Sequence, residues 1–177
     1  MTESPDEATF DRFVAAQSRR MLHAAELLVG RGDAEDLVQG VLMRMYLRWP
    51  KIKQQDPLGY GRRCLVNAAI DRSRRRMLRE VLVESVPEQV PSDQFHGHMN
   101  ADRDSVLRAL GGLTPRERAV VVLGYYEDLS ESQIAADLGI AAGTVKSTRS
   151  RALLKLRVSD HLTDRSPTAQ QEAQSDH

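Results

Sequence analysis

The chain has 177 residues, 41% of them hydrophobic and 28% charged, and its 25 basic residues balance its 25 acidic ones. This length allows one ordinary domain or two small ones, and no apolar run approaches the roughly 20 residues that a transmembrane helix needs. The composition therefore excludes a membrane-spanning chain and a low-complexity chain, and it indicates a globular protein with no membrane insertion.

The first helix is expected along residues 10–28, where apolar residues recur at steps of three, four and seven. Gly30 should end this helix. A second helix should follow, with Asp33 as its cap and Pro50 as its end. Its apolar residues also share one side, so its opposite side is expected to be polar and exposed.

A third helix is expected to begin at Asp56, because this possible cap precedes a proline at the first helical position. The helix should continue to about Glu80. The three helices together predict one small helical bundle over residues 8–80.

Charge is segregated along the chain. Residues 62–79 hold seven arginines and one acid, whereas residues 80–104 hold six acids and one arginine. Residues 144–157 hold five bases and no acid. We interpret residues 81–103, which have no sustained hydrophobic period, as a flexible acidic linker between two surfaces that face polyanions.

The second helical unit is predicted over residues 104–158. Thr114 with Glu117, and Ser130 with Gln133, have the spacing of capping boxes, so each pair is expected to begin a helix. No stretch alternates as a β-strand does. The sequence therefore predicts an all-α fold of two small helical domains joined by the linker, followed by a polar, disordered tail.

The tail is expected over residues 159–177. Upstream of it, a short helix over residues 130–138, a break at Gly139 and a further helix from about Ala142 to Arg157 predict a helix-turn-helix. A solvated amphipathic helix is the alternative, but a surface helix normally mixes charges of both signs. The predicted contacts with duplex DNA are Thr144, Lys146, Ser147, Arg149, Ser150, Arg151 and Lys155.

Two stretches carry a family resemblance. LTPRERAVVVLGYYEDLSESQIAADLGIAAGTVKSTRSRALLKL resembles both the LuxR-type output domain of response regulators and region four of the sigma-70 family. Upstream, DAEDLVQGVLMRMYLRW and DPLGYGRRCLVNAAIDRSRRR resemble region two of extracytoplasmic-function (group IV) sigma factors. The order of the stretches, and the lack of a receiver pattern, favour the sigma factor over residues 8–157.

The resemblance implies that the polar side of the second helix docks on the clamp helices of core RNA polymerase. The docking residues would be Glu35, Asp36, Gln39, Met43 and Arg44. Gly40 departs from the family pattern, which usually has an acid there, so that one contact is not expected. A glycine inside a helix also costs about 0.5–1 kcal/mol relative to alanine.

The resemblance further implies that the third helix and the loop before it bind the melted strand of a −10 promoter element. Such a strand needs basic groups for its phosphates and flat or hydrogen-bonding groups for its bases. The predicted contacts are Lys51, Lys53, Tyr60, Arg62, Arg63, Asn67, Arg72, Arg74 and Arg75.

We therefore expect a sigma factor that directs core RNA polymerase to promoter DNA through −10 and −35 elements and is itself bound by an anti-sigma factor. No nucleophile, metal-ligand or cofactor motif is visible, so no enzymatic activity, metal or cofactor is expected. The acidic N-terminus lacks a secretion signal, which predicts a cytoplasmic protein. The alternatives are a stand-alone LuxR-like transcriptional regulator and a helical regulator that binds polymerase or an anti-sigma protein.

Overall fold

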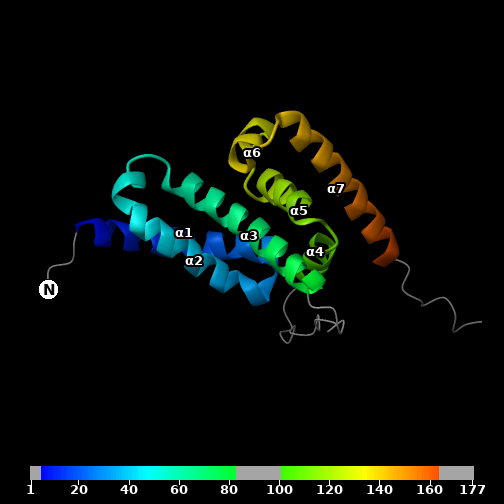
Figure 1. The fold of residues 1–177 in the computed structure, drawn as a ribbon, viewed down its shortest axis with the longest axis horizontal. Coiled ribbons are helices and arrows are strands. Elements are labelled where there is room, and N and C mark those ends of the chain that lie inside the picture. Colours follow the sequence, from blue (N-terminus) through cyan, green and yellow to red (C-terminus); the bar gives the residue numbers. More distant parts are fainter. Residues whose placement is uncertain (1–4, 83–100, 164–177) are drawn as a thin grey trace, which may run out of the picture.

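The computed structural model describes residues 5–82 and 101–163, and every regular element in these two ranges is a helix. The first range forms three helices, which are α1 (Pro5–Val29), α2 (Arg31–Ile52) and α3 (Pro57–Leu82). The second forms α4 (Ala101–Gly111), α5 (Pro115–Val121), a π-helical turn η1 (Val122–Tyr126), α6 (Glu131–Leu138) and α7 (Ala142–Thr163). Figure 1 shows the long helices α1, α2 and α3 as one bundle, with the shorter helices beside it.

The core of the first bundle is built around Trp49 near the end of α2. Its ring packs edge-on against Phe10, with centroids 5.0 Å apart, and its Nε1 donates a 2.9 Å hydrogen bond to Thr9 Oγ1. α2 also contacts α3, where a Cβ at Gly61 of α3 would lie only 2.9 Å from Sδ of the fully buried Met45 of α2. Gly61 therefore lets α3 approach α2 closely.

The expected helix starts are partly confirmed. Asp56 Oδ1 accepts a 2.8 Å hydrogen bond from the N–H of Gly59 at the start of α3, as a cap does. By contrast, Asp33 is not the cap of α2. Gly30 takes that position with φ 83°, a left-handed conformation that glycine adopts without strain, and α2 begins at Arg31.

Pro50 does not end α2, contrary to the sequence prediction, because the helix continues to Ile52. Beyond the first turn, a proline removes one N–H···O=C hydrogen bond and crowds the carbonyl four residues earlier, here that of Tyr46, and α2 runs only two residues past Pro50. The N–H of Lys53 still donates to Trp49 O at 3.0 Å, so the turn that contains Pro50 closes.

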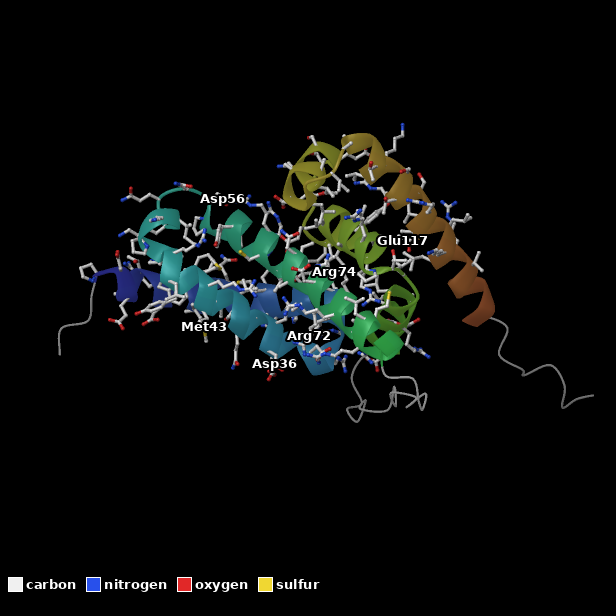
Figure 2. All side chains as sticks on the ribbon, viewed as in Figure 1. Asp36, Met43, Asp56, Arg72, Arg74 and Glu117 are labelled. Atoms are coloured by element: carbon white, nitrogen blue, oxygen red, sulfur yellow. The ribbon has the colours of Figure 1, made fainter. Side chains whose placement is uncertain are left out.

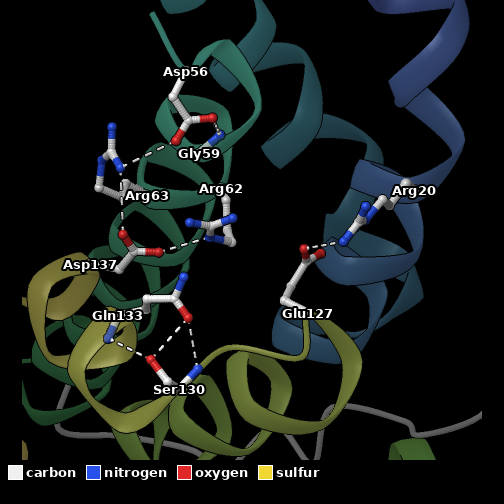
Figure 3. A network of polar contacts seen from close by, with 9 residues as sticks. All are labelled: Arg20, Asp56, Gly59, Arg62, Arg63, Glu127, Ser130, Gln133 and Asp137. Carbon is white, nitrogen blue, oxygen red and sulfur yellow. Dashed lines mark hydrogen bonds and ion pairs between the residues drawn. The ribbon is translucent and has the colours of Figure 1, made fainter.

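Both predicted capping boxes are present in the second unit. The Glu117 N–H donates to Thr114 Oγ1 while the Glu117 carboxylate accepts from the Thr114 N–H, and Ser130 and Gln133 are bonded in the same reciprocal way (Figure 3). A capping box satisfies backbone donors that a helix start otherwise leaves without partners. These local contacts fix the starts of α5 and α6.

The ends of the second unit extend beyond the predicted bounds. α4 begins at Ala101, three residues before the expected start at Asp104. α7 continues to Thr163, so residues 159–163 are helical and not part of a disordered tail. Residues 144–166 contain no glycine or proline that would stop this helix. Most of the predicted linker, and the rest of the predicted tail, lie outside the described residues.

The two helical units are in contact with each other. Several ion pairs join them. Arg118 on α5 also joins them, because its guanidinium donates a 2.9 Å hydrogen bond to Leu28 O at the end of α1. Within its own unit, Arg118 donates a 2.8 Å hydrogen bond to Leu110 O. Burial lowers the pKa of Arg118 from its ordinary value. The ion pairs between the units are Arg20–Glu127, Arg31–Asp104, Arg103–Glu26, Arg62–Asp137 and Arg63–Asp137.

Candidate nucleic-acid interface and docking surface

α6 and α7 form the helix-turn-helix that the sequence predicts. Gly139 has φ 63° and ends α6 in the left-handed conformation, which turns the chain into α7. Val145, Thr148 and Ala152 are buried on the inner side of α7. The predicted DNA contacts that lie on its exposed side are Thr144, Lys146, Ser147, Ser150 and Arg151.

The exposed side of α7 is basic and rich in hydroxyl groups. Ser147 Oγ donates to Thr144 O and Ser150 Oγ donates to Lys146 O, each over 3.1 Å, so these hydroxyls are held close to the helix. Their oxygens can still accept hydrogen bonds. Lys146 and Arg151 are exposed beside them, and Arg151 Nη2 donates to Thr148 Oγ1 over 3.4 Å. This arrangement suits contact with a phosphate backbone and with base edges.

Two predicted DNA contacts are placed differently. The Arg149 side chain is only 26% exposed and lies 3.4 Å from Glu131 on α6. Lys155 Nζ donates to Glu117 Oε2 over 2.8 Å and so ties α7 to the start of α5. Lys155 itself is exposed. The sequence signal that marked both residues was the charge of the segment, and charge alone does not tell which cations pair with acids of the same chain.

Glu117 is a buried carboxylate with several donors around it. Burial alone raises its pKa, but hydrogen bonds from Lys155 and from Thr114 outweigh burial and lower the pKa from its ordinary value. The carboxylate is therefore held in its charged form. It serves both the capping box of α5 and the contact with α7.

The predicted −10 contacts lie mostly along α3. Arg62 Nε donates a 2.8 Å hydrogen bond to Asp137 Oδ2 on α6, and Arg63 lies 3.6 Å from the other oxygen of Asp137 (Figure 3). The Asp137 side chain is only 5% exposed. These two arginines therefore bind a carboxylate of the second helical unit.

Further along α3 the predicted contacts are more accessible. Arg72 pairs with Asp33 on α2 and Arg74 lies 3.7 Å from Asp71, and both arginines are exposed. Asn67 and Arg75 are also exposed. In Figure 2, Arg72 and Arg74 are labelled along the second half of α3.

The loop before α3 brings less to this surface than the sequence predicts. Lys51 is exposed, but Lys53 pairs with Asp6 of α1. Tyr60 is half-buried against the core. Burial raises the pKa of its hydroxyl, and a side-chain hydrogen bond with Cys64 raises this pKa further. Its ring is accordingly engaged in packing as well as partly accessible.

The predicted docking residues share the exposed side of α2. Glu35, Asp36, Gln39, Met43 and Arg44 are all exposed, and Figure 2 shows Asp36 and Met43 on its outer side. The structure adds Tyr46 and Leu47, which the sequence analysis did not single out. Met43 is 66% exposed and Leu47 is 76% exposed. Large apolar side chains exposed together on one helix commonly mark an interaction surface.

The exposed side of α2 and the arginine-rich half of α3 meet at a cleft of about 730 Å³. Asp36 and Arg44 line the cleft from α2, and Arg72 and Arg75 line it from α3. Gly40 also lines it, and a Cβ there would meet nothing within 4 Å. Packing therefore does not require the glycine at this position.

No group of histidine, cysteine and acidic side chains within residues 5–82 and 101–163 is arranged to hold a metal ion. None of the helices described there has the length and apolar character needed to cross a membrane.

Comparison with known families gives the class of the protein. Residues 13–79 match the family described as Sigma-70 region 2, and residues 103–156 match Sigma-70, region 4. Together the two matches cover more than half of the chain, in the order that the helical bundle and the helix-turn-helix occupy. The chain belongs to the sigma-70 family and is an RNA polymerase sigma factor.

Curated relatives narrow the class to extracytoplasmic-function sigma factors. The chain is 40% identical over 150 residues to the RNA polymerase sigma-E factor of Streptomyces coelicolor, which covers 84% of each chain. It is 34% identical over 157 residues to the ECF RNA polymerase sigma factor SigL of Mycobacterium tuberculosis, which covers 85% of this chain and 86% of SigL. The predicted family is confirmed, and a LuxR-like regulator is not favoured.

Solved structures share the fold. The sigma factor RpoE of Bartonella quintana, solved with the anti-sigma factor NepR, gives a TM-score of 0.71 at 23% identity over 86% of this chain and 97% of that chain. CnrH, solved with the cytosolic domain of CnrY, gives 0.57 at 24% identity over 89% of each chain. The all-α fold expected from the sequence is thus confirmed.

Proposed function

We propose that the second helical unit of this sigma factor reads the −35 element as duplex DNA with the exposed side of α7. The observation that carries this proposal is the basic outer side of residues 144–157 of α7, a stretch without an acid, on a braced helix-turn-helix. Lys146 and Arg151 are exposed cations of this stretch, and Thr144, Ser147 and Ser150 are exposed hydroxyl side chains beside them. Arginine pairs with guanine edges, while lysine and hydroxyl groups hold phosphates.

We further propose that α3 binds the melted −10 strand. Asn67, Arg72, Arg74 and Arg75 offer cations and an amide along one exposed helix, and Lys51 adds a cation from the end of α2. The remaining predicted contacts, which are Lys53, Tyr60, Arg62 and Arg63, would join after their present partners are exchanged for nucleic acid. A basic track with hydrogen-bonding groups is what a single strand requires.

The exposed side of α2 is proposed as the surface that docks on core RNA polymerase. It combines two acids with an arginine, an amide and a methionine, and Tyr46 and Leu47 enlarge its apolar part. Protein interfaces of this kind place apolar anchors inside a polar rim. In this arrangement the polymerase performs the chemistry, and the sigma factor itself is not an enzyme and acts in the cytoplasm.

We also propose that an anti-sigma factor binds this chain. The two solved structures of similar fold are complexes with anti-sigma proteins, NepR in one and CnrY in the other. Such a partner would have to cover the docking surface, or the DNA-binding surfaces, to prevent initiation.

The −35 assignment is tested with holoenzyme that carries Arg151→Ala. We expect transcription from a promoter with an intact −35 element to fall about tenfold, because one good base or phosphate contact contributes roughly 1–3 kcal/mol. The same holoenzyme should be unchanged on a template whose −35 element is scrambled. Arg108→Ala, an exposed arginine on α4, is the matched control. Equal transcription by the wild type and Arg151→Ala on the intact promoter would refute the assignment.

A further inference from the structure

Arg149 points into the helix-turn-helix and not toward the exposed side of α7. Its Nε is buried and has no hydrogen-bond partner, and its Nη1 lies 3.4 Å from Glu131 Oε1. The guanidinium also lies over the ring of Tyr125, with 6.0 Å between Cζ and the ring centroid. One side chain of α7 thus contacts both η1 and α6.

The π-helical turn makes room for this side chain. A Cβ placed on Gly124 would come within 3.0 Å of Arg149 Nη2 and within 3.6 Å of Ile134 Cδ1. Gly124 lies in η1, where the wider turn replaces the expected continuation of α5. The guanidinium therefore lies in a narrow space bounded by the backbone of η1 and by the buried Ile134.

The partner of Arg149 is Glu131, an acid at the start of the first helix of the helix-turn-helix. Glu131 is in the first turn of α6, and its side chain is 39% exposed. In a helix-turn-helix the first helix crosses the DNA backbone while the second enters the groove. An acid in that first turn repels phosphates unless a cation neutralises it, and Arg149 is the cation paired with it.

We propose that Arg149 is a positioning residue of the helix-turn-helix and not a DNA contact. It holds α7 against η1 and α6, and it neutralises Glu131 so that α6 can approach the phosphate backbone. This proposal rests on the proposed function, because it assumes that α7 reads duplex DNA. It separates Arg149 from Arg151, two cations of the same helix that sequence analysis treated alike.

The test is the salt dependence of promoter binding by holoenzyme. Each cation that contacts a phosphate contributes about one unit to the slope of log affinity against log salt. Arg149→Met keeps an unbranched side chain in the narrow space, and Glu131→Gln removes the acid. The informative variant is Arg149→Met combined with Glu131→Gln, with Arg151→Ala as the reference for a contact.

We expect the double variant to keep the wild-type slope and an affinity within about twofold of wild type, because both charges of the pair are gone. Arg149→Met alone should bind about fivefold more weakly at low salt, and the difference should narrow as salt screens the uncompensated Glu131. Recovery of affinity on adding Glu131→Gln is a result that a purely structural role for Arg149 does not give.

A loss of about one unit of slope in the double variant, equal to the loss in Arg151→Ala, would show that Arg149 contacts phosphate and would overturn the proposal. Circular-dichroism melting of each variant checks that it is folded, and Arg149→Lys replaces Arg149→Met if the latter does not fold. A lysine keeps the charge for a phosphate contact, but it has no planar group to span η1 and α6. A wild-type slope with reduced affinity for Arg149→Lys would therefore support the positioning role. Unchanged affinity for Arg149→Lys would contradict the positioning role. Failure of the wild type to bind the promoter at all would refute the proposed function, and this inference with it.

Discussion

At the residue scale, Glu117 connects the start of α5 with α7. Its carboxylate accepts hydrogen bonds from the Thr114 N–H over 2.9 Å and from Lys155 Nζ over 2.8 Å, while its own N–H donates to Thr114 Oγ1. The side chain is 9% exposed, so the charge is only weakly screened by water. Removal of the charge breaks the interhelical ion pair with Lys155, whereas a glutamine can still accept the hydrogen bond from the Thr114 N–H.

Glu117→Gln is therefore expected to lower the free energy of unfolding by about 1–3 kcal/mol at neutral pH. The pKa of Glu117 is lowered from its ordinary value of 4.5, so the unfolded state binds this proton more readily than the folded state. The stabilisation is then fully present above pH 4.5 and is lost as the pH falls through the lower pKa of the folded state.

Urea unfolding of both proteins from pH 7 downward measures this difference. The gap between wild type and Glu117→Gln should shrink toward acid pH, whereas Glu35→Gln, an exposed acid on α2, should cost little at any pH. A gap that stays constant below pH 4.5 would contradict the assigned ionisation of Glu117.

At the scale of helices, Ser130 controls the start of the helix that braces α7. Ser130→Ala removes the acceptor for the Gln133 N–H and should destabilise the second unit by about 1 kcal/mol, the usual contribution of an N-cap. Ser132→Ala is the matched control, because it removes only the hydrogen bond between the Ser132 and Ser130 hydroxyls and leaves the capping box of Ser130 and Gln133 in place. Thermal unfolding followed by circular dichroism measures both, and equal melting temperatures for the two variants would show that the cap does not matter.

Helix starts of this kind were predictable from sequence because they depend on residues three positions apart. Asp56, Thr114 and Ser130 cap their helices as their spacing indicates. The predicted end at Pro50 was two residues too early, since the turn that contains the proline still closes through the hydrogen bond from the Lys53 N–H to Trp49 O. Local chemistry thus predicts where helices start better than where they stop.

The side that a charged residue occupies was harder to predict. Arg149 and Arg151 are two positions apart in one basic segment, yet the first turns inward because η1 widens at Gly124 and offers it space. Arg62 and Asp137 are 75 positions apart in the sequence, and their pairing depends on how the two units pack together. Neither contact leaves a local signal in the sequence, whereas the exposed side of α2 followed directly from its hydrophobic period.

At the scale of the whole molecule, the described arrangement brings the two promoter-reading units together. Elements centred at −10 and −35 are about 25 base pairs apart, or about 85 Å along duplex DNA at about 3.4 Å per base pair. In the structure, Asp137 of α6 instead pairs with Arg62 and Arg63 of α3. Reading both elements at once therefore requires these contacts to break.

Asp137→Asn should consequently favour separation of the units and free the two arginines. We expect the full-length chain to bind a single-stranded −10 oligonucleotide about three- to tenfold more tightly, because the competing carboxylate is lost. Fluorescence anisotropy of a labelled oligonucleotide measures the affinity. Asp128→Asn is the control, since this exposed residue has φ 54°, which asparagine also accepts. Unchanged affinity for Asp137→Asn would show that the contact does not compete with DNA.

The central claim is that this chain gives core RNA polymerase its promoter specificity through both units. The most direct measurement is transcription reconstituted from purified core polymerase, this chain and a template selected by the resulting holoenzyme. The account predicts a defined transcript that requires the chain and is lost when either the −10 or the −35 element of the template is scrambled. Specific duplex binding by the chain alone, with no transcript when core polymerase is present, would contradict it.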